Sequence, residues 1–167
     1  MRNIEIKARL ADIRAAEKTA EEIATKNLGT QHQIDTYFDA RHGRLKLRQI
    51  DGLSAQLIWY SRPDSEEPAA SDYELVPVPN PETLKTALTA AMGTRIVVEK
   101  YRRILLWNNV RIHLDRVTSL GEFLEFEAVI GPSDDETAAY EQVEELMRRF
   151  DIEPADLLPN SYADMLI

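Results

Sequence analysis

The sequence predicts an α+β fold: an eight-stranded antiparallel closed β-barrel with helices packed on its outside. Three observations lead to this prediction. Several segments alternate charged with bulky apolar residues, most clearly Arg44-Leu45-Lys46-Leu47-Arg48. Side chains along a strand point alternately to opposite faces, so each such strand is apolar on one side and charged on the other. Amphipathic helices can cover the apolar faces, and a barrel lets the charged faces point into a hydrated lumen.

The first part of the chain predicts a strand, a helix and a second strand. Residues 2–10 alternate charged and apolar side chains, as a half-buried strand does. Residues 11–27 carry apolar residues at helical spacing, and Gly29 is suited to end that helix. Residues 31–38 read as the next strand.

The basic strand and its hairpin follow. Residues 39–43 form a tight connection into the strand at 44–50. Asp51-Gly52 is a strong hairpin signal and leads into a strand at 55–61. Residues 63–70 read as an acidic loop.

The remaining elements have equally local signals. A strand at 71–78 ends in prolines, and Asn80-Pro81 provides an N-cap and first-turn pair for a helix at 82–92. Two asparagines join strands at 94–107 and 110–117 in a hairpin.

The chain then predicts one more strand and one more helix. After Gly121 comes a strand at 122–130, and Ser133 is expected to cap a long acidic helix that runs to about Phe150. No repeat or linker interrupts the pattern, so residues 1–167 are expected to form a single domain.

Composition excludes several classes of function. The net charge of -9 argues against nonspecific nucleic-acid binding and against an anionic membrane surface, and we expect no nucleic-acid partner. The chain has no cysteine and therefore no disulfide, thiolate nucleophile or cysteine zinc site. No apolar run is long enough to span a bilayer, and we expect a cytoplasmic protein. About half of the Lys and Arg residues lie in the predicted strands, which suits a site for a small anion.

Five motifs together resemble the CYTH family. They are Asn3-Ile-Glu-Ile-Lys7, Arg44-Leu-Lys-Leu-Arg48, Lys100-x-Arg102, Arg111-x-His-x-Asp115 and Phe123-Leu-Glu-Phe-Glu127. The family is also known as the triphosphate tunnel metalloenzymes and includes class IV adenylyl cyclases and thiamine or inorganic triphosphatases. The resemblance implies an enzyme that binds a small-molecule triphosphate in a basic tunnel with Mg²⁺ or Mn²⁺, and it leaves a homodimer open. In one departure, Asn3 stands where the family signature has its first glutamate, so one metal carboxylate is missing.

The cations on matching strand faces are the candidate triphosphate ligands. Arginine forks match phosphate oxygens, and lysine acts as a point charge. The candidates are Lys7, Arg9, Arg44, Lys46, Arg48, Arg62, Lys100, Arg102 and Arg111. The alternative is a solvated outer strand face with neighbouring acids, and Arg9 could equally form a surface ion pair.

Four carboxylates are the candidate metal ligands, because Mg²⁺ and Mn²⁺ prefer hard oxygen donors. They are Glu5, Asp115, Glu125 and Glu127. The alternative is ion pairing with the arginines of the tunnel. The candidate catalytic residues are Lys7, Lys46, Arg48 and His113, although His113 is equally readable as a structural histidine.

Three functions remain open from the sequence. The first is metal-dependent cleavage of a triphosphate-containing substrate, and the second is conversion of ATP to cyclic AMP and pyrophosphate by a class IV adenylyl cyclase. The third is a noncatalytic polyanion-binding module, for which the missing glutamate at Asn3 is the best support. A purely structural, salt-bridged barrel is a weaker alternative.

Overall fold

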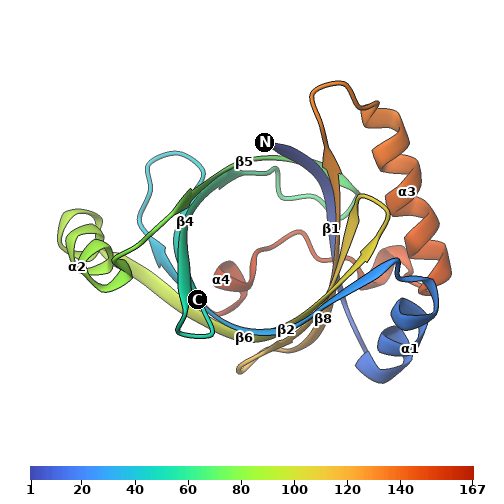
Figure 1. Ribbon diagram of the computed structural model, residues 1–167, viewed down its shortest axis with the longest axis horizontal. Helices are drawn as coiled ribbons and strands as arrows, with labels where there is room; N and C mark the ends of the chain where they lie inside the picture. The colour runs from blue at the N-terminus through green and yellow to red at the C-terminus, as the bar shows by residue number, and fades with distance from the viewer.

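A computed structural model describes residues 1–167, and its eight strands form one closed antiparallel barrel (Figure 1). The strands are β1 Arg2–Arg9, β2 Lys26–Phe38, β3 Arg44–Ile50, β4 Ser54–Ser61, β5 Ala69–Pro77, β6 Thr94–Trp107, β7 Val110–Val117 and β8 Gly121–Ile130. Around the ring they follow the order β1-β5-β4-β3-β2-β6-β7-β8. Since β1 pairs with both β5 and β8, the first strand closes the ring. The predicted fold class is confirmed.

The alternation in the sequence determines which side of each strand faces the interior. On β3, Leu45 and Leu47 pack with Phe38 in a cluster on the outside of the barrel, under helix α2 (Pro81–Met92). Lys46 and its neighbouring cations line the cavity inside. The strand therefore buries its apolar side under the helix and turns its charged side inward.

The other long helices cover the opposite side of the barrel. Helices α1 (Ile13–Ile23) and α3 (Glu136–Arg149) lie outside β1, β7 and β8, away from α2 (Figure 1). The largest apolar cluster joins the outward side chains of these strands, such as Ile4 and Phe126, to helical residues such as Val143. Burying each large apolar side chain contributes about 1.5–3 kcal/mol, so this cluster fixes the helices to the sheet. None of the helices has the length and apolar composition that crossing a bilayer requires.

The first helix is shorter, and the second strand longer, than the sequence predicts. The helix ends at Ile23 instead of Asn27, and β2 begins at Lys26, which pairs with Leu106 of β6. The long β6 offers backbone partners to this segment, and tertiary pairing outweighs local helical preference. Gly29, with φ of 85°, does not end the helix but lies at a register shift between the two strands.

The third helix begins later than predicted. Its N-cap is Asp135, whose side chain accepts a hydrogen bond from the Thr137 backbone N–H at 2.9 Å. Asp134 accepts from the backbone N–H of Gly131 at 2.7 Å, which holds the preceding turn. The prediction of Ser133 as the cap is wrong, because these two aspartates satisfy the backbone donors first.

The C-terminal segment returns to the barrel after α3. It contains a 3₁₀ helix, η1 (Pro154–Asp156), and the short helix α4 (Tyr162–Met165). The backbone N–H of Leu158 donates to the Lys7 carbonyl at 2.9 Å, on the part of β1 that extends beyond its pairing with β5. In the view of Figure 1, α4 lies within the outline of the ring.

Contacts of α4 show that it covers one end of the barrel. Tyr162 packs on Phe123 with ring centroids 5.0 Å apart, and Asp164 pairs with Arg44 at 3.0 Å and with Arg95 at 3.1 Å. These partners come from the beginnings of β8, β3 and β6. We call this end the covered end, and the opposite end, where β1 and β2 begin, the open mouth.

Candidate active site

The barrel encloses a cavity of about 330 Å³. Eight Lys and Arg side chains line it, against three glutamates, in a chain whose net charge is -9. The predicted site residues that line it are Glu5, Lys7, Arg44, Lys46, Arg48, Arg62, Lys100, Arg102, Arg111, His113, Glu125 and Glu127. Arg9 and Asp115 do not line it. The charged strand faces therefore look inward at each other, as the sequence indicates.

One wall of the cavity gathers three cations on a single carboxylate. Asp35, fully buried, accepts hydrogen bonds from Arg48 Nε and Nη2, both at 2.7 Å. The Nζ atoms of Lys100 and Lys46 lie 2.8 Å and 3.1 Å from Asp35 Oδ2. Burial alone would raise the pKa of Asp35, but the three cations hold it well below its ordinary value. The wall keeps an excess of positive charge that faces the cavity.

Arg62 is a further cation with unused donors. Its Nε atom forms an ion pair with Glu5 Oε1 at 3.3 Å without hydrogen-bond geometry, and its Nη2 atom is buried without any hydrogen-bond partner. Unpaired buried donors cost free energy unless a ligand accepts from them. Arg62 is thus placed to donate to an anion in the cavity.

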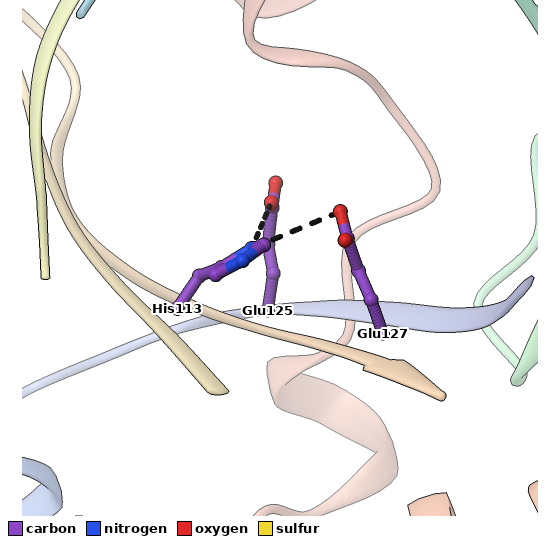
Figure 2. Close-up of side chains that lie close together, drawn as sticks. All are labelled: His113, Glu125 and Glu127. Atoms are coloured by element: carbon purple, nitrogen blue, oxygen red, sulfur yellow. Dashed lines mark ion pairs between the residues drawn. The ribbon is translucent and has the colours of Figure 1, made fainter. Parts of the chain in front are cut away.

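The opposite wall carries the acidic groups (Figure 2). His113 Nδ1 lies 3.7 Å from Glu125 Oε2 and 3.7 Å from Glu127 Oε1, which is beyond hydrogen-bond length. One ligand atom from each of the three residues lies within 4.8 Å of the others. His113 Nδ1 is buried without a partner, as is Oδ1 of Asn3 on β1. These donor atoms fit a divalent cation.

Glu5 adds a further carboxylate beside this group. It pairs in register with Glu127 across β1 and β8. Burial, followed by repulsion from Glu127, raises the pKa of Glu5 to about 7, although Arg62 opposes the shift. The carboxylates of Glu5 and Glu127 thus repel each other although Arg62 and Arg111 lie beside them, and a divalent cation would relieve that repulsion.

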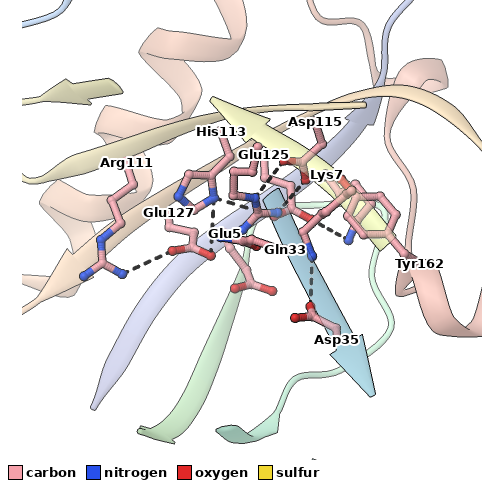
Figure 3. Close-up of polar contacts among 12 residues, drawn as sticks. Glu5, Lys7, Gln33, Asp35, Arg111, His113, Asp115, Glu125, Glu127 and Tyr162 are labelled. Carbon is pink, nitrogen blue, oxygen red and sulfur yellow. Dashed lines mark hydrogen bonds and ion pairs between the residues drawn. The ribbon is translucent and has the colours of Figure 1, made fainter. Parts of the chain in front are cut away.

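Asp115 lies elsewhere. It is fully buried and accepts hydrogen bonds from Arg102 and, at 2.8 Å, from the Tyr162 hydroxyl of α4 (Figure 3). Arg102 also donates to Glu125. Asp115 therefore contacts Arg102 and Tyr162, and it is not one of the His113 group, by which we mean His113, Glu125 and Glu127.

The other predicted cations are placed at different depths. Lys7 Nζ lies 2.8 Å from Glu125 Oε1 inside the barrel, whereas Arg111, with 40% of its side chain exposed, lies 3.4 Å from Glu127 at the open mouth. Arg44 pairs with Asp164 of α4 at the covered end. Arg9 is exposed and donates to the Leu120 carbonyl at 3.2 Å, outside the cavity.

Sequence reasoning missed two residues of this interior. Asp35 shares a strand face with Tyr37, so the alternation alone could have placed it on a charged inner face. Tyr162 lies on a four-residue helix, which is too short to show a periodic pattern of apolar residues. No local signal predicts that its hydroxyl reaches Asp115.

Tripolyphosphate binding at pH 8 is expected to take up protons, because Lys100 is poorly charged in the free protein. Burial lowers the pKa of Lys100 to about 7, and the Asp35 carboxylate only partly offsets the effect. A polyanion beside the amine raises that pKa, so Lys100 takes up a proton on binding. Calorimetric titration without metal, in buffers of different ionisation enthalpy, measures the uptake.

Two variants assign the proton. Lys100→Met should reduce the uptake, and Glu5→Gln should leave most of it in place. An uptake that persists unchanged in Lys100→Met would contradict the assignment.

Comparisons with known proteins agree with this geometry. The sequence profile of the CYTH domain matches residues 1–162. The PH1012 protein of Pyrococcus horikoshii has the same fold, with a TM-score of 0.86 and 23% identity over 97% of this chain and 98% of that one. A proposed adenylate cyclase of Vibrio parahaemolyticus has a TM-score of 0.79 and 20% identity, covering 98% and 97%.

A third similar structure is HpAC1 of Hippeastrum, an adenylyl cyclase candidate with a dominant triphosphatase activity. Its TM-score is 0.63 and its identity 18%, over 98% of this chain and 93% of that one. Among curated protein sequences, none matches this chain. At these identities the solved structures establish the shared barrel.

Proposed function

This chain belongs to the CYTH domain family, and we propose that it is a metal-dependent enzyme that binds and cleaves a triphosphate-containing substrate inside its barrel. One observation carries the proposal. The same cavity has an excess of Lys and Arg on one wall and a separate group of His113, Glu125 and Glu127 on the other. A multiply charged anion and a cation can therefore be bound side by side.

The cations would bind the phosphate chain. Arg48, Lys46 and Lys100 share one carboxylate and keep an unneutralised positive charge towards the cavity. Arg62 has a buried Nη2 without a hydrogen-bond partner, and Lys7 approaches from β1. Arginine donates to phosphate oxygens through its planar fork, and lysine contributes a point charge.

His113, Glu125 and Glu127 would hold the metal ion, with Glu5 and the Asn3 carbonyl oxygen nearby. Mg²⁺ or Mn²⁺ suits the carboxylates, and the imidazole nitrogen favours Mn²⁺ over the strictly oxygen-preferring Mg²⁺. A bound divalent ion polarises a phosphoryl oxygen and neutralises charge. Asn3 would contribute a neutral oxygen where the family signature has a carboxylate.

Cleavage of a triphosphate requires positioning and charge stabilisation more than covalent catalysis. An attacking water oxygen forms a new bond to phosphorus as the bridging P–O bond breaks, and the leaving phosphate carries away the electron pair. Lys7, Lys46 and Arg48 are placed to stabilise the negative charge that develops on the phosphoryl and leaving oxygens. The water's proton passes to solvent or to a nearby carboxylate.

The cyclase reaction is the second candidate. There the ribose 3′-hydroxyl attacks the α-phosphorus and pyrophosphate leaves. The same cations serve both reactions, so the arrangement supports either. Aliphatic side chains such as Ile50 and Ile104 also line the cavity, which suits a substrate with an organic group.

Product analysis tests the proposal. Purified protein with Mg²⁺ or Mn²⁺ is incubated with tripolyphosphate or ATP, and we expect phosphate release. Cyclic AMP with pyrophosphate would instead identify a cyclase. Tripolyphosphate binding with neither product would reject an enzyme and leave a polyanion-binding module.

Lys46→Ala tests the contribution of the cation wall, the wall of the cavity on which Lys46, Arg48 and Lys100 surround Asp35, to triphosphate binding. The fold should persist, because Asp35 keeps Arg48 and Lys100. Tripolyphosphate affinity should fall about tenfold, because the variant removes one charged donor to the phosphate oxygens. Lys18→Ala, on the exposed side of α1, is the matched control and should bind like the parent.

A further inference from the structure

Glu125 and Glu127 differ in how far cations already occupy their oxygens. Both oxygens of Glu125 are taken: Lys7 Nζ lies 2.8 Å from Oε1, and Arg102 Nη2 donates to Oε2. Glu127 has a looser partner, because the Arg111 guanidinium lies 3.4 Å away on a side chain that is 40% exposed. A metal ion can therefore reach Glu127 directly, but it must displace a cation to reach Glu125.

Of the two cations on Glu125, Lys7 is the one that can leave. Arg102 is fixed by Asp115, which accepts from its Nε at 2.7 Å and also from its Nη2. Lys7 has no second carboxylate partner, and its ammonium otherwise lies 4.1 Å from the centroid of the Tyr162 ring (Figure 3). A lysine has a flexible stem and rotatable donors, whereas a guanidinium with two partners is held in one plane.

Lys7 also lines the cavity, so its ammonium can pass from Glu125 to a bound anion. Its side chain is only 8% exposed. An ammonium that left Glu125 without a new partner would be a buried unpaired charge, which is strongly unfavourable. A triphosphate in the cavity provides that partner, since phosphate oxygens accept charge-assisted hydrogen bonds. The exchange is therefore favourable only when a polyanion is present.

We propose that Lys7 guards Glu125 and withholds this carboxylate from the metal ion until a triphosphate draws the ammonium away. This inference rests on the proposed function, because it assigns how that site admits its metal. Metal and triphosphate then bind cooperatively, and each raises the affinity of the other by the same factor. The site holds its metal weakly as long as it lacks a substrate.

Binding of Mn²⁺ with and without a polyanion measures this coupling independently of turnover. The polyanion is methylene-bridged tripolyphosphate, which resists hydrolysis, and electron paramagnetic resonance measures the free Mn²⁺. The complex that the two form in solution has the same constant in every titration and cancels when variants are compared. The coupling factor is the ratio of the Mn²⁺ dissociation constants without and with the polyanion.

Lys7→Met removes the guard. Without the polyanion, Mn²⁺ should bind this variant about tenfold more tightly than the parent, because Glu125 is available. With the polyanion its Mn²⁺ affinity should change little, because Glu125 is available in both proteins. The coupling factor should therefore fall about tenfold, and the remaining coupling comes from phosphate oxygens that bind the metal directly.

Lys46→Met is the matched control, because Lys46 contacts Asp35 and Tyr37 on the cation wall and not Glu125. It should weaken binding of the polyanion, but its coupling factor should match that of the parent within about twofold. Lys7→Gln removes the charge and keeps an N–H donor for Glu125. It should shift Mn²⁺ binding in the same direction as Lys7→Met, and it serves as the test if Lys7→Met folds poorly.

The outcomes separate the guard from the proposed function. Equal coupling factors in the parent and the Lys7 variants would show that Glu125 is not guarded, and the triphosphate and metal sites would stand. An equal loss of coupling in Lys46→Met would also overturn the inference, because any lost positive charge would then have the same effect. A parent that binds the polyanion but no Mn²⁺ would overturn the metal-dependent function, and this inference with it.

Discussion

Asp35→Asn is expected to lower the free energy of unfolding by about 3–5 kcal/mol, because it leaves buried cations without their shared carboxylate. The Arg48 guanidinium cannot lose its proton, so its charge remains buried in the variant. Lys100 can release its proton, which limits the cost. Chemical denaturation followed by circular dichroism measures the change. Asp72→Asn, at a side chain that is 59% exposed, is the matched control and should change stability by less than about 0.5 kcal/mol.

Tripolyphosphate should partly restore the stability of Asp35→Asn. A ligand that binds only the folded state shifts the unfolding equilibrium, and the variant has more unneutralised positive charge to offer it. We therefore expect a larger rise in the unfolding midpoint for the variant than for the parent. An Asp35→Asn protein that unfolds at the same denaturant concentration as the parent would show that the cation wall needs no carboxylate.

Glu127→Gln is expected to reduce metal-dependent turnover by at least about 100-fold, because it removes a charged ligand from the His113 group. Metal-free binding of tripolyphosphate should be retained, since the change removes a negative charge from the cavity wall. Product release at saturating Mn²⁺ measures the first effect, and calorimetry the second. Glu74→Gln, on a side chain that is 68% exposed, should turn over substrate like the parent.

Retention of turnover in Glu127→Gln would contradict the assignment of the metal to this wall. Loss of both turnover and tripolyphosphate binding would indicate a damaged barrel, which circular dichroism would detect.

Local signals predicted much of the fold. The bounds of β3, β6 and β7 are those that the alternation and the asparagine turn indicate. At the hairpin, Asp51 and Gly52 have φ of 52° and 66°, the left-handed values that this dipeptide favours. Where a residue's own neighbours decide its conformation, the sequence was enough.

Long-range register decided what the sequence could not predict. The function of Asp35 depends on its pairing opposite Arg48 in β3 and on the reach of Lys100 from β6. Asp115 shares a strand face with His113, but its position opposite Arg102 commits its oxygens to that guanidinium and to the tail. The boundary between α1 and β2 moved for the same reason, since β6 supplied partners that local propensity could not indicate.

The closure of the ring by β1 has a consequence for how the chain folds during synthesis. The strand β1 emerges from the ribosome before its partners β5 and β8, which end only at Pro77 and Ile130. Such distant pairings are slow to form, and an unpaired strand edge invites association with other chains. The two edges of the open sheet therefore remain unpaired during synthesis until β8 has been translated. Slow folding and a dependence on chaperones during overexpression are the expected results.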